Sequence, residues 1–510
     1  MESKQSAGGV SPMVIALIAA IAVLAVLFLI WPAWRAALPL EILRSEGFNA
    51  YHTDTALSVP SRLYPPPDGL VANNYPPLYD FLIGGLAQLF GDALYVGRAI
   101  SLLATLGLGV AAAAVVRQLG GGRTAATLAG AWFVATMARF YDEFVGTNDP
   151  QLLAHLIMAV GLVWFISRYK ADRPVEPAVL VMVIAGFFKQ NVAAIPVAAL
   201  LWLALDDWRK GLRAALFGAL AAVTGLAICA WLWNPYFIGD ILLPRTYHLD
   251  RALSFYRATN LWLHALALWA LWAWLERQSK AARFTMLHVG ASFVLFMLQR
   301  SAQGPGSNAQ FDLVFAIAIG VGLAFDRLPI CLGWKWQPAR IRLVVLTILL
   351  VRLIASPRME FAYVLLSPDY RALAADYSAV ARAEAARLAA IRHPIACYNL
   401  VICRMAGKSF VFDHFKVSQM VATGGYSWDE IAAMTRAQNI SFEAVDPGAR
   451  TLSLFRRCPT VNETWYYSLT GKAAVWRQKG HERGFTLECP SPAGKVRYLQ
   501  DADSASKQTP

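Results

Sequence analysis

The chain contains many long runs of apolar residues, and this feature limits its fold more than any other. A helix needs about 20 mostly apolar residues to span a bilayer, and about eleven runs of near that length follow one another up to residue 355. Only 15% of the 510 residues are charged, against about 25% in soluble proteins. The sequence therefore predicts a mainly α fold, a polytopic bundle of transmembrane helices with about 11 spans.

One pair of predicted spans is short and is separated by the polar residues Lys189, Gln190 and Asn191. A polar break at membrane depth is tolerated only where it faces protein or a water-filled cavity, so this break is a candidate functional feature. The predicted spans are residues 13–31, 99–116, 125–140, 151–167, 177–188, 192–205, 213–233, 259–275, 284–298, 311–325 and 341–355.

The distribution of basic residues predicts the orientation. The net charge is +13, and basic residues cluster after alternate spans, as at residues 168–173, 209–213 and 277–283. Cytoplasmic connections carry such an excess of lysine and arginine. We therefore interpret the charge as a sign of topology and lipid contact, not of nucleic-acid binding. The predicted location is a bacterial inner membrane, with a cytoplasmic N-terminus and the C-terminal region in the periplasm.

The chain divides into two predicted domains. Residues 1–355 form the membrane domain, and their first outer loop, 32–98, is long. Within this loop we expect an amphipathic helix on the membrane face over residues 34–52. An interfacial helix is expected over residues 75–91, and the alternative there is a further span.

Residues 356–500 have the composition of a soluble extracytoplasmic domain, and the tail 501–510 is expected to be disordered. Helices are expected at 375–392 and 427–439, with strands at 395–403, 408–413 and 440–446, which predicts a small α/β fold. Four cysteines fall in this domain: Cys397, Cys403, Cys458 and Cys489. Two disulfides of undetermined pairing are expected in an oxidising compartment; the alternatives are reduced cysteines and metal ligands.

Ionisable residues of the membrane domain gather at the predicted outer ends of spans. They include Glu46 and Asp54 in the first loop, Asp149 before the fourth span, Lys189 at the break, and Asp312 before the tenth span. Such groups are rare among membrane helices without a function. Carboxylates and a lysine at one depth suit a lipid phosphate together with a hydroxyl that loses its proton.

Several segments, in order, resemble GT-C glycosyltransferases such as the protein O-mannosyltransferases and the aminoarabinose transferases. NNYPPLYDFLIGGLAQLFGDALYVGRAISLL resembles the stretch after their first loop, where a small residue and an arginine precede the second span. RSEGFNAYH resembles their acidic first-loop motif, and GTNDPQLLAHLIMAVGL the start of their fourth span. AGFFKQNVAAIP resembles their lysine-containing break, and GPGSNAQFDLVFAIAIGVGLAF a later polar start.

The resemblance implies an inverting transferase that moves a sugar from a polyprenyl-phosphate donor to a glycan, lipid or protein acceptor on the outer face. Ser45 stands where the family has the first acid of a pair, so the identity of the general base stays open. The implied catalytic residues are Glu46, Asp149 and Asp54. Donor contacts are expected from Lys189, Arg245, Tyr75 and Tyr79, and other substrate contacts from Asn49, His52, Asn74, His155, Gln190, Asn308 and Asp312.

Alternatives remain at the level of residues and of function. Asp149 could simply cap its helix, and Lys189 could extend to the interface. A divalent metal ion on His52, Glu46 and Asp54 is a further option, and the need for a metal stays open. The whole chain could be a flippase or transporter of a lipid-linked sugar, or an inactive relative that serves binding or assembly. Transporters often carry an internal repeat, and the sequence shows none that is convincing.

Overall fold

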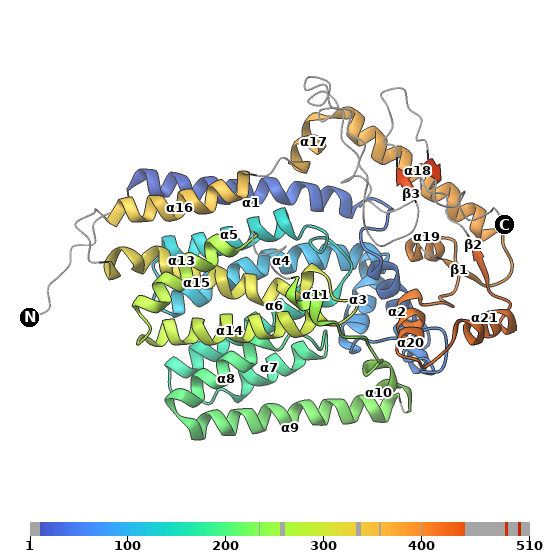
Figure 1. Ribbon diagram of the computed structural model, residues 1–510, viewed down its shortest axis with the longest axis horizontal. Helices are drawn as coiled ribbons and strands as arrows, with labels where there is room; N and C mark the ends of the chain where they lie inside the picture. The colour runs from blue at the N-terminus through green and yellow to red at the C-terminus, as the bar shows by residue number, and fades with distance from the viewer. Residues whose placement is uncertain are drawn as a thin grey trace, which may run out of the picture.

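The computed structural model describes residues 11–233, 235–254, 261–332, 338–355, 359–397, 399–443, 485–487 and 498–500. These residues form an elongated helical bundle with a smaller mixed domain at one end (Figure 1). The predictions for Cys458, Cys489 and the tail 501–510 lie outside the described residues.

Every predicted span coincides with a helix, which confirms the mainly α, polytopic membrane fold. Six segments are long and apolar enough to cross a membrane: α1, α4, α6, α9, α14 and residues 307–331. Helices α7, α8 and α13 are shorter and apolar. The bundle helices are α1 (Pro12–Ala36), α4 (Ala93–Gln118), α5 (Arg123–Phe140), α6 (Pro150–Lys170), α7 (Glu176–Gly186), α8 (Ala194–Asp206), α9 (Trp208–Leu232), α13 (Leu263–Leu275), α14 (Lys280–Ser301), α15 (Phe311–Cys331) and α16 (Pro338–Ile354).

Helix α15 forms the centre of the bundle. It is apolar on all sides and buried from Phe311 to Phe325, as expected for a helix enclosed by other helices. Helices α4, α5, α13 and α14 pack around it. Helix α9, in contrast, lies at the lower edge in Figure 1 and exposes a row of leucines and valines. Such a face suits contact with lipid.

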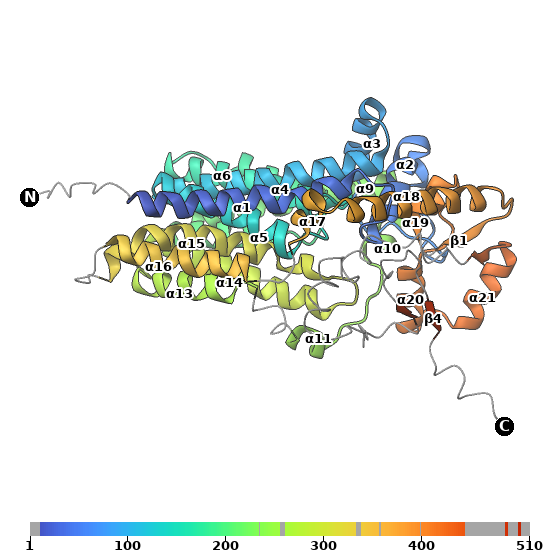
Figure 2. The same ribbon diagram turned by 90° about the horizontal axis from the view of Figure 1, so that it is seen from above.

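The first loop and two later connections gather at the end of the bundle opposite the N-terminus (Figures 1 and 2). They contain α2 (Ser45–Ser58), η1 (Pro60–Arg62), α3 (Leu78–Phe90), α10 (Tyr236–Ile241), α11 (Leu249–Leu253) and η2 (Ser307–Gln310). Helix α3 has 13 residues and rises about 20 Å, less than the roughly 30 Å of a bilayer core. Its length therefore favours the interfacial helix over a further span.

The helix expected over residues 34–52 is only partly correct. Residues up to Ala36 continue α1, residues 37–44 form turns, and α2 begins at Ser45. The carbonyl groups of Leu38 and Leu40 in these turns accept hydrogen bonds from the Arg98 side chain. Because these carbonyls are bound by a side chain of α4, the segment does not continue as a helix.

The C-terminal domain alternates helices and short strands. Its elements are α17 (Glu360–Leu366), α18 (Pro368–Ala389), β1 (Ile395–Cys397), α19 (Leu400–Met405), α20 (His414–Ala422), α21 (Trp428–Ala437), β2 (Ser441–Glu443), β3 (Phe485–Leu487) and β4 (Tyr498–Gln500). Strands β1 and β2 are parallel, with Ile395 opposite Ser441. Strands β3 and β4 are antiparallel, with Phe485 opposite Gln500. Both predicted helices are confirmed, as α18 and α21.

One strand prediction in this domain is too long and another is wrong. The strand expected at 395–403 ends at Cys397, because the Asn399 side chain caps α19 by accepting a hydrogen bond from the Ile402 amide at 3.1 Å. Residues 408–413 form no strand. The amide of Asp413 instead donates to the carbonyl of Leu70 in the first outer loop, at 2.8 Å. Contacts with the membrane domain thus override the local strand pattern.

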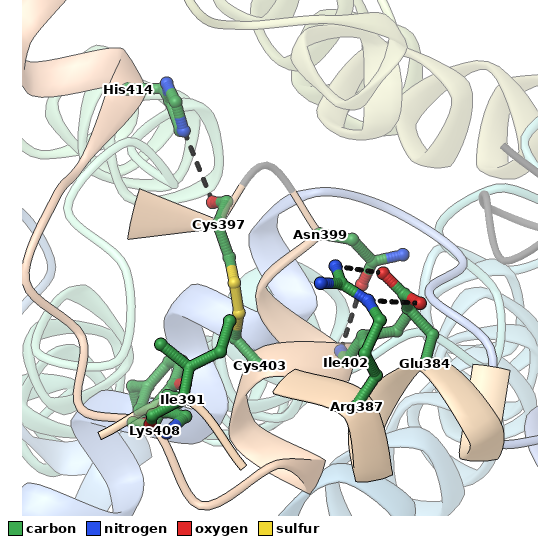
Figure 3. The surroundings of a disulfide bond; sticks show 10 residues. Glu384, Arg387, Ile391, Cys397, Asn399, Ile402, Cys403, Lys408 and His414 are labelled. Carbon is green, nitrogen blue, oxygen red and sulfur yellow. Dashed lines mark hydrogen bonds and ion pairs between the residues drawn. A yellow bond between two sulfur atoms is a disulfide. The ribbon is translucent and has the colours of Figure 1, made fainter. Parts of the chain in front are cut away.

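A disulfide joins Cys397 at the end of β1 to Cys403 in α19 (Figure 3). Both cysteines are buried, and the ring of His414 lies 3.2 Å from the Cys397 carbonyl oxygen. The predicted disulfide chemistry is therefore present in the described part of this domain. Cys229 and Cys331, both in bundle helices, are free.

Candidate active site

Asp149 and Lys189 form a buried ion pair at the outer end of the bundle. Asp149 precedes Pro150, which starts α6, and its Oδ1 caps that helix by accepting from the Gln151 amide at 2.8 Å. The same Oδ1 accepts from Lys189 Nζ at 2.7 Å, and the Ser45 hydroxyl donates to Oδ2 at 3.3 Å. Asp149 is 5% exposed and Lys189 is 3% exposed. Helix capping and ion pairing thus coincide in one carboxylate.

The break between α7 and α8 carries Lys189 and is fastened to the first loop. Its ammonium lies 4.6 Å from the centre of the Tyr75 ring, a distance typical of a cation–π contact. The Gln190 side chain donates to the carbonyl of Asn74 at 2.8 Å, and the Leu78 amide donates to the carbonyl of Phe187 at 3.2 Å. The polar break predicted from the sequence therefore faces protein.

Glu46 is fully buried and bound by four donors. Arg98 Nε and Nη2 each donate to one of its carboxylate oxygens at 2.8 Å, which is the paired geometry that strengthens such contacts. The amides of Ile42 and Asn148 complete the set at 2.7 Å and 3.0 Å. A carboxylate held in this way is well suited to fix the fold around it.

Asn148 connects these two acidic positions. Its side-chain oxygen accepts from the Tyr79 hydroxyl at 2.6 Å, and its carbonyl accepts from Asn49 Nδ2 at 2.6 Å. A Cβ atom on Gly97 would lie 1.8 Å from the Asn148 side-chain oxygen. Only glycine at this position lets α4 approach the loop before α6, so the placement of Asp149 depends on it.

A second polar group lies deeper along α6. His155 Nδ1 lies 2.7 Å from the Gln151 carbonyl, and its Nε2 lies 3.3 Å from Asp312 Oδ1. Asn308 donates from Nδ2 to the Gln151 side-chain oxygen at 3.3 Å. The structure thus brings His155, Asn308 and Asp312 together around Gln151, two residues from Asp149.

Asp54 lies on the exposed side of α2 and is bound there by Arg404 of the C-terminal domain. Arg404 Nε donates to Asp54 Oδ2 at 2.7 Å, and Arg404 Nη1 contacts both oxygens of Asp92 at 2.8 Å. Arg245 lies over the Phe415 ring at 5.6 Å. The structure therefore does not group Asp54 or Arg245 with the Asp149–Lys189 pair.

His52 is enclosed by aromatic rings. Its ring centre is 4.3 Å from that of Phe48 and 5.8 Å from that of Phe410, and burial lowers its pKa to about 3. Among the described residues, no group of three histidine, cysteine or acidic side chains is placed to hold a metal ion. The combination of His52, Glu46 and Asp54 is not assembled.

The C-terminal domain covers this site from outside. Helix α19 packs on α2 so closely that a Cβ atom on Gly47 would lie 2.3 Å from Leu400 Cβ. The Tyr51 hydroxyl donates to the carbonyl of Lys408 at 2.7 Å. Helix α2, which carries Ser45 and Glu46, is therefore held between the bundle and this domain.

Sequence reasoning did not single out Arg98, Asn148 and Ser45 as members of the site. For Arg98 a signal was present, because one arginine follows the YPPLY segment at the start of an otherwise apolar span. For Asn148 the only signal was its position beside Asp149, whereas Ser45 was noted only as the residue in place of the first acid of the family's pair. Their partners are some 100 residues away along the chain.

Comparison with known proteins agrees with the predicted resemblance. Residues 74–233 match the family described as dolichyl-phosphate-mannose-protein mannosyltransferase. This match includes Tyr75, Tyr79, Asp149 and Lys189. No curated protein matches the sequence significantly.

Solved structures share the fold at low sequence identity. ArnT from Cupriavidus metallidurans in the apo state is 14% identical, with a TM-score of 0.54 over 83% of this chain and 90% of that chain. ArnT bound to undecaprenyl phosphate is 15% identical, with a TM-score of 0.53 over 91% and 95%. The Archaeoglobus fulgidus oligosaccharyltransferase in the apo form is 11% identical, with a TM-score of 0.52 over 96% and 74%. Residues 74–233 thus match this mannosyltransferase family and the chain shares the fold of ArnT, which agrees with the predicted resemblance to the GT-C glycosyltransferases.

Proposed function

We propose that this protein is a membrane glycosyltransferase that moves a sugar from a polyprenyl-phosphate donor to an envelope acceptor. The observation that carries the proposal is the buried Asp149–Lys189 pair within the segment that matches the family. A carboxylate can accept the proton of an acceptor hydroxyl. An ammonium can stabilise the phosphate that leaves. Both groups lie where the long helices end and the outer loops begin.

An apolar groove between α7 and α9 offers a place for the donor's prenyl chain. It has a volume of about 400 Å³ and is lined by leucine, isoleucine, valine and phenylalanine side chains, including Phe187 and Phe217. Phe187 is two residues before Lys189, so a chain in this groove would lead its phosphate towards the ammonium. ArnT, which shares the fold, was crystallised with undecaprenyl phosphate.

The proposed reaction is a direct displacement. The acceptor oxygen forms a bond to the anomeric carbon as the bond from that carbon to the phosphate oxygen breaks. The electron pair of the broken bond leaves with polyprenyl phosphate, and the hydroxyl proton goes to the Asp149 carboxylate. Lys189 stays with the phosphate. One displacement inverts the configuration at the anomeric carbon, and every step uses side chains of this chain alone.

The proposal includes an orientation. The first turn of α9, which carries Arg209 and Lys210, and the start of α1 lie at one end of the bundle, and the start of α6, which Asp149 caps, lies at the other (Figure 1). Under the positive-inside rule the end with Arg209 and Lys210 faces the cytoplasm. The site and the C-terminal domain then face the periplasm of a bacterial inner membrane.

The test is transfer in proteoliposomes. Purified protein receives labelled undecaprenyl-phosphate pentoses and hexoses together with an envelope extract, and label is followed from donor to acceptor. We expect Asp149→Asn to reduce transfer at least 100-fold, and Lys189→Met to raise the donor concentration at half-maximal rate. Asp172→Asn is the matched control, because Asp172 forms an exposed pair with Lys210 at 2.7 Å.

The same experiment separates the alternatives. If donor moves between leaflets but no label reaches acceptor, the protein is a flippase. If neither occurs with the wild-type protein, an inactive relative is favoured. Equal transfer by Asp149→Asn and wild type would overturn the assignment of Asp149.

A further inference from the structure

Three partly exposed aromatic rings form a continuous wall beside the Asp149–Lys189 pair. Tyr75 lies against Lys189 and meets Phe48 edge to face, with ring centres 5.8 Å apart. Phe48 in turn meets Phe410 of the C-terminal domain edge to face at 5.9 Å. We call Tyr75, Phe48 and Phe410 the aromatic wall.

The wall rings are more open than two rings that pack in the hydrophobic clusters of the same region. Tyr64 and Phe412 are almost completely enclosed, at 1% and 4% exposure. The wall rings are each left partly exposed, although Tyr75 lies against the ammonium of Lys189, which is nearly inaccessible. Aromatic surface left open beside a few placed polar groups is typical of a ligand site.

Phe410 is held in place from both sides of its loop. On one side Arg404 binds Asp54 and Asp92. On the other, Lys416 Nζ donates to the carbonyl of Val71 at 2.7 Å. The Tyr51 ring stacks on Phe410 with centres 5.3 Å apart and planes 13° apart. Contacts between the two domains therefore fix the position of the Phe410 ring.

We propose that the aromatic wall binds a sugar ring of the acceptor, so that the acceptor is a glycan or glycolipid and the C-terminal domain supplies Phe410 to its subsite. This inference rests on the proposed transfer function. The axial C–H groups of a pyranose pack on the face of an aromatic ring, whose negative quadrupole attracts them. The hydroxyls at the sugar's edge remain free, and one of them can approach Asp149.

The uncharged wall favours this acceptor over a peptide. The wall rings themselves carry no charge to receive the charged side chains common in proteins. Lys189, which lies against Tyr75, is already paired with Asp149. The wall would therefore recognise its ligand by contact with apolar ring faces and by hydrogen bonds.

The test measures the acceptor dependence of transfer with a phenol-extracted envelope glycan fraction and, separately, an envelope protein fraction. We expect label in the glycan fraction. In Phe410→Ala, the glycan concentration that gives half the maximal rate should rise at least tenfold. The undecaprenyl-phosphate sugar concentration that gives half the maximal rate should stay unchanged. Phe410→Tyr should restore the wild-type value. Trp428→Ala, which alters an aromatic residue of the same domain that is 62% exposed, is the control.

The outcomes distinguish this inference from the proposed function. If the wild-type protein transfers sugar but Phe410→Ala leaves the acceptor dependence unchanged, or label enters only the protein fraction, the inference is overturned. If the wild-type protein transfers nothing, the proposed function fails. Should Phe410→Ala prevent folding, Phe48→Leu keeps an apolar side chain and removes a ring, and the same tenfold shift is expected.

Discussion

At the scale of single residues, the two buried acids of the site have different surroundings. Glu46 accepts from four donors and is completely enclosed, whereas Asp149 shares its oxygens with Lys189, Ser45 and its own helix. Ligand binding can draw Lys189 away from Asp149, but the two-point contact of Arg98 with Glu46 belongs to the fold. This difference favours Asp149 as the base.

A comparison of amide variants tests this difference. In Glu46→Gln the side-chain NH₂ group faces donors that now bind the Glu46 carboxylate. The variant also breaks the buried ion pair with Arg98, and breaking such a pair costs about 3–5 kcal/mol. We expect Glu46→Gln to lower the melting temperature by several degrees. Asp149→Asn also removes the counter-ion of a buried cation, but its amide oxygen still accepts from the Gln151 amide and from Lys189, and Lys189 keeps its contact with Tyr75. It should therefore lose transfer with a smaller change in melting temperature. The reverse ranking in a thermal-shift assay would contradict the assignment.

Asp240 gives a prediction for pH dependence outside the membrane helices. Burial raises the pKa of its carboxyl to about 7, and one oxygen accepts from the Asn73 amide at 3.0 Å. An unfolded aspartate titrates near its ordinary value of about 4. The folded protein therefore holds a proton that the unfolded chain releases between these values, and this stabilisation is lost as the pH rises through 7.

We expect the protein to melt at a higher temperature at pH 6 than at pH 8, and Asp240→Asn to reduce the difference. Asparagine keeps the acceptor for Asn73 and does not titrate. Thermal shift measured at a series of pH values checks this. An unchanged slope in Asp240→Asn would assign the effect to other groups, such as Glu41, whose pKa burial and nearby Glu46 raise to about 8.

At the scale of elements, the contact between α2 and α19 decides whether the site is complete. A Cβ atom at position 47 would lie 2.7 Å from the backbone carbonyl carbon of Leu400 as well as against its side chain. A backbone contact this short cannot be relieved by a side-chain rotation, so α19 must shift. We expect Gly47→Ala to reduce transfer more than tenfold and to increase proteolysis of the C-terminal domain.

Gly85 supplies the control for this variant. It lies in α3, also a helix of the first loop, and a Cβ atom there would meet nothing within 4 Å. Gly85→Ala should leave transfer and protease resistance unchanged. If Gly47→Ala and Gly85→Ala show the same transfer and the same protease resistance, the close approach of α19 to α2 is not needed for function.

The α7–α9 groove allows a separate test of donor binding. Ala221→Phe would fill the groove, and we expect it to raise the donor concentration at half-maximal rate several-fold. A second apolar groove, between α1 and α4, is lined mainly by alanines that include Ala33 and Ala99. Ala33→Phe in that groove is the control. The opposite pattern would place the prenyl chain between α1 and α4.

At the scale of the whole molecule, orientation can be measured by labelling. With the parent chain as background, Arg209→Cys should react with a membrane-impermeant maleimide only after cells are permeabilised. His248→Cys, in the outer connection before α11, should react in intact cells. Both positions are exposed. Reaction of Arg209→Cys alone in intact cells would invert the proposed topology.

The fold was predictable from the sequence where burial in a bilayer dictates composition. All predicted spans overlap helices, since a continuous apolar run has few other solutions in lipid. The strand at 408–413 was wrong, because the segment is bound to the other domain at both ends: the Tyr51 hydroxyl donates to the Lys408 carbonyl, and the Asp413 amide donates to the Leu70 carbonyl. The local sequence pattern does not indicate contacts with residues so far away along the chain.

The candidate site was predictable in its residue types but not in its pairings. Asp149 and Lys189 were both named, and they lie 2.7 Å apart. Glu46 and Asp54 looked equivalent in the first loop, yet one is enclosed by Arg98 and the other is held by Arg404. These partners are 52 and 350 residues away, so only the three-dimensional arrangement separates the two acids.

The Asp149–Lys189 contact also has a consequence for turnover. In the resting protein the two charges cancel, so an arriving phosphodiester with one negative charge meets a nearly neutral locality. After transfer the phosphate carries a further negative charge, while Asp149 has become neutral by taking the proton. The ammonium is then held by the product alone. Return of Asp149 to its carboxylate form restores the resting ion pair, so the release of spent carrier lipid is coupled to the reset of this pair.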